Sequence, residues 1–431
     1  MTRPGLAPSM MVRAGAGLSA AAATSAVAAW RPRWWEAAVT LAILGGIEPL
    51  IQAVSIRVMP VFARRQWRST RLLAAQAALT FAGAWLCWFG RIAGGAPVIA
   101  AGAFAALAGG ALMAANVAML LRQPAGPGAL PVPSATQVAA DRCGRQFTRL
   151  AGACLVYGLA VGAAVPDWEP ASGRWDLVWA HSLLVGFFLS MVAGVSYHVL
   201  PRWTGVPWER VRPMAVHFRI VAAGLPLMIA ALAFDLPRLF AVAGVAEAAG
   251  VALFLSIIAP QAPRLPGPTR HAFLLGGVAL GVGILLGGAF AVDPATGAAL
   301  RQTHAVLNVF GFAGAFTAGS AYYLAPRFAG RPLRWPGPAL GTVLAIFGGA
   351  ALAAAGWAWR VRWGGPWWPA AGGALLLAGA FAVEAVILWA TFVLPPARPV
   401  QPLLLRSGGA RQPEATNAPA CPDHCPVGTV A

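Results

Sequence analysis

Apolar segments long enough to cross a membrane follow one another along almost the whole chain, and this feature restricts the fold most. Only 10% of the 431 residues are charged, whereas a soluble domain has roughly 25%. A spanning helix needs about 20 apolar residues, and helices satisfy their own backbone hydrogen bonds in lipid. Because no segment alternates as the strands of a barrel do, we predict an all-α polytopic membrane protein.

The apolar pattern predicts about 12 transmembrane helices, of which the first is weak and resembles the apolar part of a signal peptide. The predicted segments are 14–30, 36–60, 71–90, 96–121, 147–165, 177–200, 214–234, 238–259, 272–292, 302–325, 338–358 and 370–394. They form one transmembrane domain, 1–394, with a flexible loop from Arg122 to Gln146. We expect the Pro-rich residues 395–431 to be a disordered cytoplasmic tail.

All 31 basic residues are arginine, and most of them lie in alternate loops. By the positive-inside rule this places both termini in the cytoplasm. The net charge of +18 does not indicate nucleic-acid binding, because the arginines form no basic domain. The absence of lysine is typical of a GC-rich bacterial genome, so we expect a multi-pass protein of the bacterial inner membrane, with the lipid bilayer as its partner.

A pattern that ends in proline occurs three times, and a glycine lies 15 residues before the proline in each copy. The copies are Gly45 to Pro60, Gly186 to Pro201 and Gly311 to Pro326. They fall on the second, sixth and tenth predicted helices, so the chain divides into three four-helix units, 14–121, 147–259 and 272–394. We interpret each proline as a helix stop.

Two histidines occupy similar depths on repeat-related helices. His181 lies five residues before Gly186, and His304 lies seven residues before Gly311. Ionisable groups inside a bilayer are functional candidates, and imidazole is the commonest metal ligand. The pair could therefore bind a metal or cofactor at a common centre. The alternative is two interfacial histidines that are hydrogen-bonded to neighbouring helices.

Other polar residues in apolar segments are secondary candidates. His198, Arg57 and Tyr323 occupy equivalent repeat positions and could form a polar cluster, although packing and snorkelling would also explain them. His217 and His271 lie at helix ends, where an interfacial position is expected. The remaining candidates are three carboxyl groups that could carry protons or pair with arginine, and a tail motif that could handle metal: Glu48, Glu247, Glu384, Cys421, His424 and Cys425.

The sixth and tenth helices resemble those of subunit I of heme-copper oxidases and nitric oxide reductases. The segments that carry the resemblance are Trp179–His181, Val185–Phe188, Tyr197–Arg202, Thr303–His304, Gly311–Phe312 and Tyr322–Arg327. In that family the sixth-helix histidine binds copper, and a His-x-His pair on the tenth helix binds two hemes. The resemblance implies that His304 binds heme b, and that His181 is a distal ligand of the same heme or part of a reduced copper site.

This chain also departs from the family. It has Val306 where the second histidine of the pair would stand, and its second helix carries no histidine. The segment Ala223–Leu227 lacks the family's second and third copper ligands. The chain is therefore more similar to the NnrS-like branch, which implies a heme-binding, copper-binding membrane protein of nitric oxide metabolism or response. Binding and turnover of nitric oxide both remain open. The alternatives are a metal-free transporter and an assembly factor for a respiratory complex.

Overall fold

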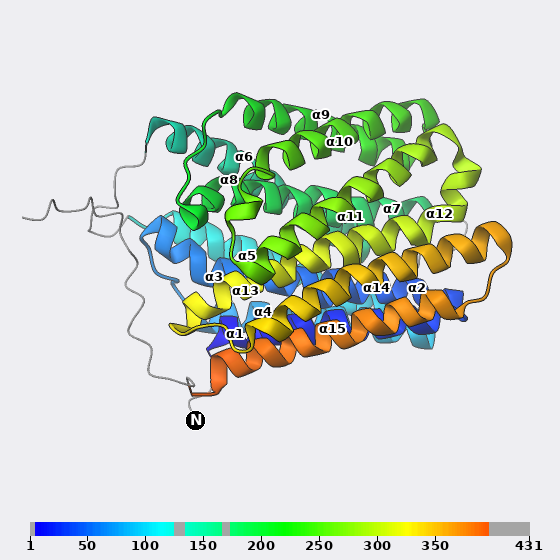
Figure 1. The fold of residues 1–431 in the computed structure, drawn as a ribbon, viewed down its shortest axis with the longest axis horizontal. Helices are drawn as coiled ribbons and strands as arrows, with labels where there is room; N and C mark the ends of the chain where they lie inside the picture. The colour runs from blue at the N-terminus through cyan, green and yellow to red at the C-terminus, as the bar shows by residue number, and fades with distance from the viewer. Residues whose placement is uncertain (1–4, 125–133, 166–172, 396–431) are drawn as a thin grey trace, which may run out of the picture.

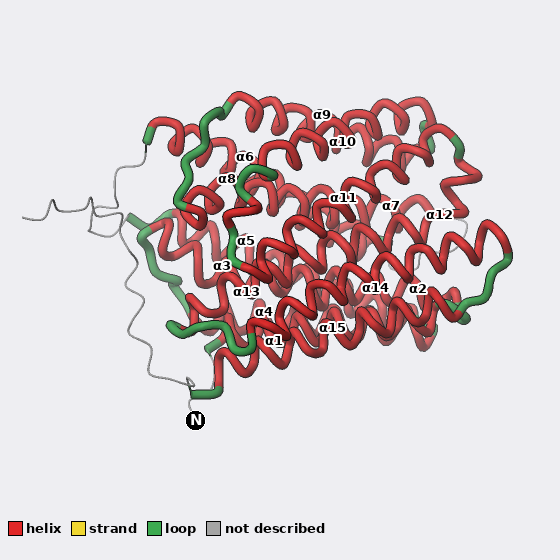
Figure 2. The backbone as a smooth tube through the Cα atoms, in the orientation of Figure 1, coloured by secondary structure: helices red, strands yellow, loops and turns green. Residues whose placement is uncertain are grey.

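The structure is a computed structural model that describes residues 5–124, 134–165 and 173–395. Helix is the only regular structure in these ranges, and short loops join the helices (Figure 2). The first unit consists of α1 (Leu6–Ala28), η1 (Pro32–Trp34), α2 (Trp35–Leu41), η2 (Ala42–Ile47), α3 (Glu48–Ala63), α4 (Thr70–Ala93) and α5 (Ala96–Leu121).

The second and third units repeat this order. The second consists of α6 (Ala135–Ala164), α7 (Gly173–His181), η4 (Ser182–Leu189), α8 (Ser190–Thr204), α9 (Arg212–Phe234) and α10 (Pro237–Ile258). After η5 (Ala262–Arg264), the third consists of α11 (Gly267–Val292), α12 (Pro294–Val306), η6 (Leu307–Gly314), α13 (Ala315–Ala329), α14 (Pro336–Trp363) and α15 (Trp368–Val393). The prediction of three four-helix units agrees with this order.

Eleven helices in the described residues are long and apolar enough to cross a membrane. The first predicted segment, 14–30, is not among these eleven and corresponds to α1, which is 23 residues long, begins earlier than predicted and packs along α15. The ends of the described chain, at α1 and α15, lie at the same end of the bundle (Figure 1). This is the relation expected for an even number of crossings.

The three helices that carry the repeated motif, which we call the motif helices, form the core of the molecule. They are α2–η2–α3, α7–η4–α8 and α12–η6–α13. Their most apolar stretches are 83%, 67% and 83% buried, whereas the other candidate spans are 28–56% buried. The remaining helices surround them, and the surrounding layer is continuous because α5 packs on α6, α10 on α11 and α15 on α1. The fold is therefore a closed ring of three equivalent units.

Side-chain caps begin several of these helices. The hydroxyl of Ser69 accepts from the amide of Leu72 at the start of α4, and Ser134 accepts from Gln137 at the start of α6. A cap of this kind satisfies one of the free amides in the first turn of a helix. The prediction of a flexible loop from Arg122 to Gln146 is wrong for its second half, because the Ser134 cap begins α6 twelve residues before the predicted start at 147.

The motif prolines do not stop their helices, contrary to the prediction. Each motif helix continues three residues further and ends where the residue four after the proline takes a left-handed conformation. These residues are Arg64, Gly205 and Gly330, with φ of 53°, 73° and 63°. The amide of each bonds the carbonyl of its motif proline, a common way to end a helix. We call the end of the bundle where the three motif helices finish the motif end.

Candidate functional site

Each motif helix contains a π-helical segment around the repeated glycine. These segments are η2, η4 and η6, and Gly45, Gly186 and Gly311 lie within them. The η2 segment contacts both η4 and η6, and the rings of Phe188 and Phe312 join η4 to η6 with centroids 5.4 Å apart. The three irregular segments therefore meet at the centre of the bundle. Such bulges occur frequently at functional sites.

His304 stands one turn before η6, and its ring is held in a fixed orientation. Its Nδ1–H donates to the carbonyl of Gly283 on α11 at 2.8 Å. Asn308 donates to the His304 carbonyl at 2.8 Å, and the ring of Phe290 lies 5.2 Å away, centroid to centroid. Because Nδ1 carries the proton of the neutral ring, Nε2 carries a lone pair. Metal-binding histidines usually have this second hydrogen bond.

His181 has the same arrangement at the end of α7. Its Nδ1–H donates to the carbonyl of Leu177 at 2.8 Å, which leaves the lone pair on Nε2. The two histidines are close enough to interact electrostatically. The structure therefore places the two residues that sequence reasoning paired within electrostatic range of each other, on α7 and α12, whose labels lie towards the end of the bundle opposite the motif end (Figure 1).

An ion pair links the helices that carry these histidines. Arg301 on α12 binds the carboxylate of Asp176 on α7, and Asp176 is buried. Both groups also interact electrostatically with His181. A second ion pair lies near them in the first unit, where Arg91 donates to Glu36 at 3.3 Å. All three units therefore contribute charge around the Asp176–Arg301 ion pair.

The donor set around the pair fits one cofactor of the resemblance better than the other. A heme needs a single protein nitrogen as its axial ligand, and His304 offers one in a fixed tautomer. A copper centre of the oxidase kind needs three histidines. In the described residues, no three side chains of His, Cys, Asp or Glu lie close enough together to hold a metal ion. The residues therefore fit a heme and do not fit a three-histidine copper site.

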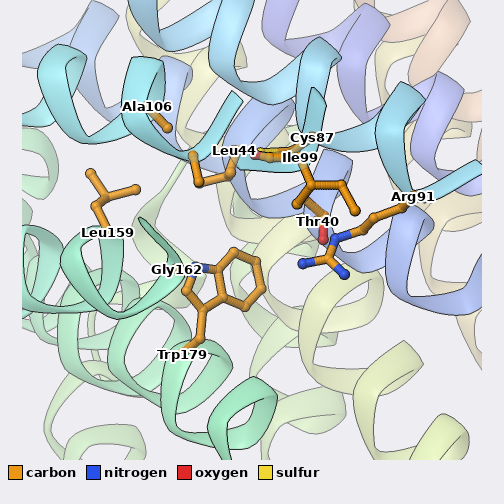
Figure 3. Close-up of a pocket in the computed structure, with 10 residues that line it drawn as sticks. Thr40, Leu44, Cys87, Arg91, Ile99, Ala106, Leu159, Gly162 and Trp179 are labelled. Carbon is orange, nitrogen blue, oxygen red and sulfur yellow. The ribbon is translucent and has the colours of Figure 1, made fainter. Parts of the chain in front are cut away.

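A small pocket lies between the first and second units, on another face of α7. Figure 3 shows the indole of Trp179 facing Leu44 and Ile99, with Arg91 and Thr40 beside them. Residues two apart on a helix do not face each other, so Trp179 and His181 point in different directions. The pocket volume is about 10 Å³, about the least that holds one water molecule. It is not a cofactor site.

The residues predicted as a polar cluster each contact an aromatic ring of the adjacent unit. Phe62 packs on His198 with centroids 4.3 Å apart, and Trp203 stacks on Tyr323 at 3.9 Å. The guanidinium carbon of Arg57 lies 5.6 Å from the centroid of Phe328. In each contact the aromatic residue lies two positions after the motif proline of one unit. Its partner lies three positions before the motif proline of the next unit. We call this closed set of three contacts the motif ring.

His198 has a further partner outside the ring. Its Nδ1–H donates to Asp141 on α6 at 2.7 Å, and Arg202 donates to the same carboxylate at 2.9 Å. The sequence placed Asp141 in a flexible loop and gave no reason to connect it with His198. Histidine, arginine and aspartate therefore form an ion-paired group at the motif end.

The prediction that His217 is interfacial is wrong. His217 is 2% exposed, and its ring lies between those of Phe147 and Phe254. Its Nδ1 is 2.7 Å from the hydroxyl of Tyr197. Tyr322 makes the equivalent bond to Thr342 in the third unit at 2.6 Å. These are buried bonds between the second and third helices of a unit, which periodicity alone cannot reveal.

Three buried carboxyl groups complete the set of candidates. Glu48, Glu247 and Glu384 are 1–3% exposed, and one oxygen of each lacks a hydrogen-bond partner in the described part of the chain. Among these three, Glu48 belongs to a polar chain: Gln52 donates to it at 3.0 Å, and Gln76 donates to Gln52 at 3.0 Å. The tail cysteines Cys421 and Cys425 lie outside the described residues.

Comparison with solved structures shows the fold. The chain is similar to the structure described as a heme-copper terminal oxidase dimer, with a TM-score of 0.70 and 12% sequence identity. The match covers 92% of this chain and 86% of that one. No family model matches the sequence, and no curated protein matches it. At this identity the likeness establishes the fold, including the threefold arrangement of four-helix units predicted from the sequence.

Proposed function

We propose that this chain is a heme-binding membrane protein, a distant relative of heme-copper oxidases of the NnrS-like kind, that binds or converts nitric oxide. One observation carries the proposal. His181 and His304 lie on two neighbouring motif helices of an oxidase-like fold, and each ties its Nδ1–H to a main-chain carbonyl. Both rings therefore keep the Nε2 lone pair that a heme iron requires.

The roles of the residues follow from their contacts. His304 would hold the heme iron, because Gly283 fixes its tautomer and Asn308 holds its backbone. His181 would lie close to the same heme. A bound heme would supply an iron that can bind nitric oxide. We assign no copper, because the described residues offer no third ligand.

The test is the visible spectrum of the protein purified from heme-replete cells. We expect a b-type Soret band that shifts when nitric oxide is added, and that is lost in His304→Ala. His181→Ala should keep the heme but change its spin state and its response to nitric oxide. His271→Ala is the matched control, because His271, like His181, donates Nδ1–H to the carbonyl four residues earlier, which for His271 is that of Gly267. A colourless wild-type protein, or heme that survives His304→Ala, would refute the proposal.

A metal-free transporter is the second candidate, and the buried carboxyl of Glu48 favours it. Glu48 ends a hydrogen-bonded chain that runs through Gln52 and Gln76 to Asn116, all of them buried. Buried ionisable groups of this kind mark ion pathways in transporters. The candidate requires a heme-free protein in which Glu48→Gln abolishes solute uptake into proteoliposomes.

A further inference from the structure

A pocket of about 220 Å³ lies at the motif end of the third unit, far along the bundle from the histidine pair. It is formed by the loop between α13 and α14 and by the last turn of α15. Its principal lining residues are Arg331, Leu333, Arg334, Trp335, Thr391 and Leu394. The lining combines two guanidinium groups, an indole and aliphatic side chains.

The pocket carries uncompensated positive charge. None of its lining residues is acidic, and no salt bridge found in the described residues involves Arg331 or Arg334. Their present partners are carbonyl oxygens at the end of α15. Arg331 donates to those of Phe392 and Leu394, and Arg334 donates to that of Pro395. A guanidinium group has five N–H donors, so both arginines keep donors for an anion.

The surroundings of the pocket are those of a membrane interface. Trp335 is 43% exposed and lies 5.8 Å from the guanidinium carbon of Arg334, and exposed tryptophan is typical of the headgroup layer. Along α15, Val386 and Val383 are exposed one and two turns before the pocket. An aliphatic chain that left the pocket could lie along them.

We propose that this pocket binds the headgroup of an anionic phospholipid. Its phosphate would accept hydrogen bonds from Arg331 and Arg334, which suit phosphate geometry, and its acyl chains would run along the exposed face of α15. A free phosphate would not use the apolar half of the lining. By the arginine distribution, this lipid belongs to the cytoplasmic leaflet, whose anionic lipids attract basic side chains.

The experiment measures lipid binding to the full chain in neutral detergent by native mass spectrometry. Phosphatidylglycerol is compared with phosphatidylcholine. We expect the wild type to prefer phosphatidylglycerol by about tenfold. Arg331→Gln combined with Arg334→Gln should abolish this preference. The matched control combines Arg210→Gln and Arg212→Gln, which remove two exposed arginines from the corresponding place in the second unit, the loop between α8 and α9 and the first residue of α9.

Arg334→Gln alone is the second variant, because Arg331 donates to two carbonyls, those of Phe392 and Leu394, whereas the Arg334 side chain donates to one, that of Pro395, which lies beyond α15. It should reduce the preference without changing the thermal unfolding temperature of the lipid-free protein. An equal loss in the control variant would make the effect one of general charge and overturn the proposal. So would a wild type without any preference for phosphatidylglycerol. Displacement of the lipid by an equal concentration of inorganic phosphate would assign the pocket to a free anion instead.

Discussion

The residue four positions after each motif proline ends the motif helix. Gly205 and Gly330 adopt the left-handed conformation without strain, whereas Arg64 adopts it with a side chain. A left-handed conformation costs a residue with a Cβ roughly 1–2 kcal/mol. The first unit therefore stores a small strain at a position where the other two units have none.

Substitution at this position should have opposite effects in different units. Gly205→Ala and Gly330→Ala should each lower the free energy of unfolding by about 1 kcal/mol. A Cβ at either glycine meets no atom within 4 Å, so the loss comes from the backbone alone. Arg64→Gly should relieve the strain and raise the thermal unfolding temperature in detergent. Equal losses at all three positions would contradict this account.

Sequence reasoning identified the motif prolines but missed how their lost hydrogen bonds are replaced. Proline has no N–H, so the carbonyl four residues earlier loses its partner. The indole of Trp67 donates to Ile56 at 2.7 Å, and that of Trp208 donates to Tyr197 at 2.9 Å. Both tryptophans stand seven residues after a motif proline. That shared spacing was a signal in the sequence, and Leu333 occupies the position in the third unit.

The motif helices are built from short pieces, and in the second and third units the joints directly follow the pieces that carry His181 and His304. The sequence predicted one continuous helix in each case, because apolar residues continue through the α-helical and the π-helical turns alike. Glycines allow the close packing at these joints. A Cβ on Gly17 of α1 would overlap the carbonyl oxygen of Gly45 in η2. Element type was thus predictable from hydropathy, whereas the joints depend on contacts between helices.

The α12 helix, which carries Arg301 and His304, begins at an aspartate cap. The carboxylate of Asp293 accepts from the hydroxyl of Thr296 at 2.6 Å and from the amide of Ala295 at 3.0 Å. Hydrogen bonds from Thr296, and then from Ala295, hold the pKa of Asp293 below its usual value. The cap therefore stabilises α12 fully above the usual aspartate pKa, and its effect is lost as the pH falls through the lowered pKa.

Hydrogen exchange at the start of α12 should report this titration. After correction for intrinsic rates, the amides of Ala295 and Thr296 should lose protection in acid in the wild type. In Asp293→Asn, which keeps an acceptor oxygen but no titrating group, protection should not vary with pH. Asp293→Ala should lack protection at every pH. The same acid-dependent loss in Asp293→Asn would rule out the cap as its cause.

At the scale of the molecule, the motif ring closes the three units onto one another. Sequence reasoning found the repeat and the equivalence of Arg57, His198 and Tyr323, but it placed these residues in contact with one another. The structure instead shows each residue against an aromatic ring of the adjacent unit. Which unit's aromatic residue contacts which neighbouring unit depends on how the helices assemble. The sequence of a single copy of the motif cannot predict it.

Double-mutant cycles should resolve the ring into separate contacts. Trp203→Ala and Tyr323→Ala should be coupled by about 0.5–1.5 kcal/mol, the usual range for aromatic pairs. Phe62→Ala and Tyr323→Ala belong to different contacts and should be additive. Thermal or denaturant unfolding in detergent gives the energies. Coupling of similar size in both cycles would mean that the ring unfolds as one unit.

The packing of α15 on α1 corresponds to that of α5 on α6 and of α10 on α11, and it is the most extensive of the three. Each boundary between units therefore joins the last helix of one unit to the first helix of the next, and the boundary between α15 and α1 forms without a direct connection along the chain. Because α1 begins and α15 ends at the same end of the bundle (Figure 1), a linker could join them while the chain is opened between α5 and α6. Such a circular permutation would retain all three boundaries, so we expect each of the three possible orders of the units along the chain to specify the same fold.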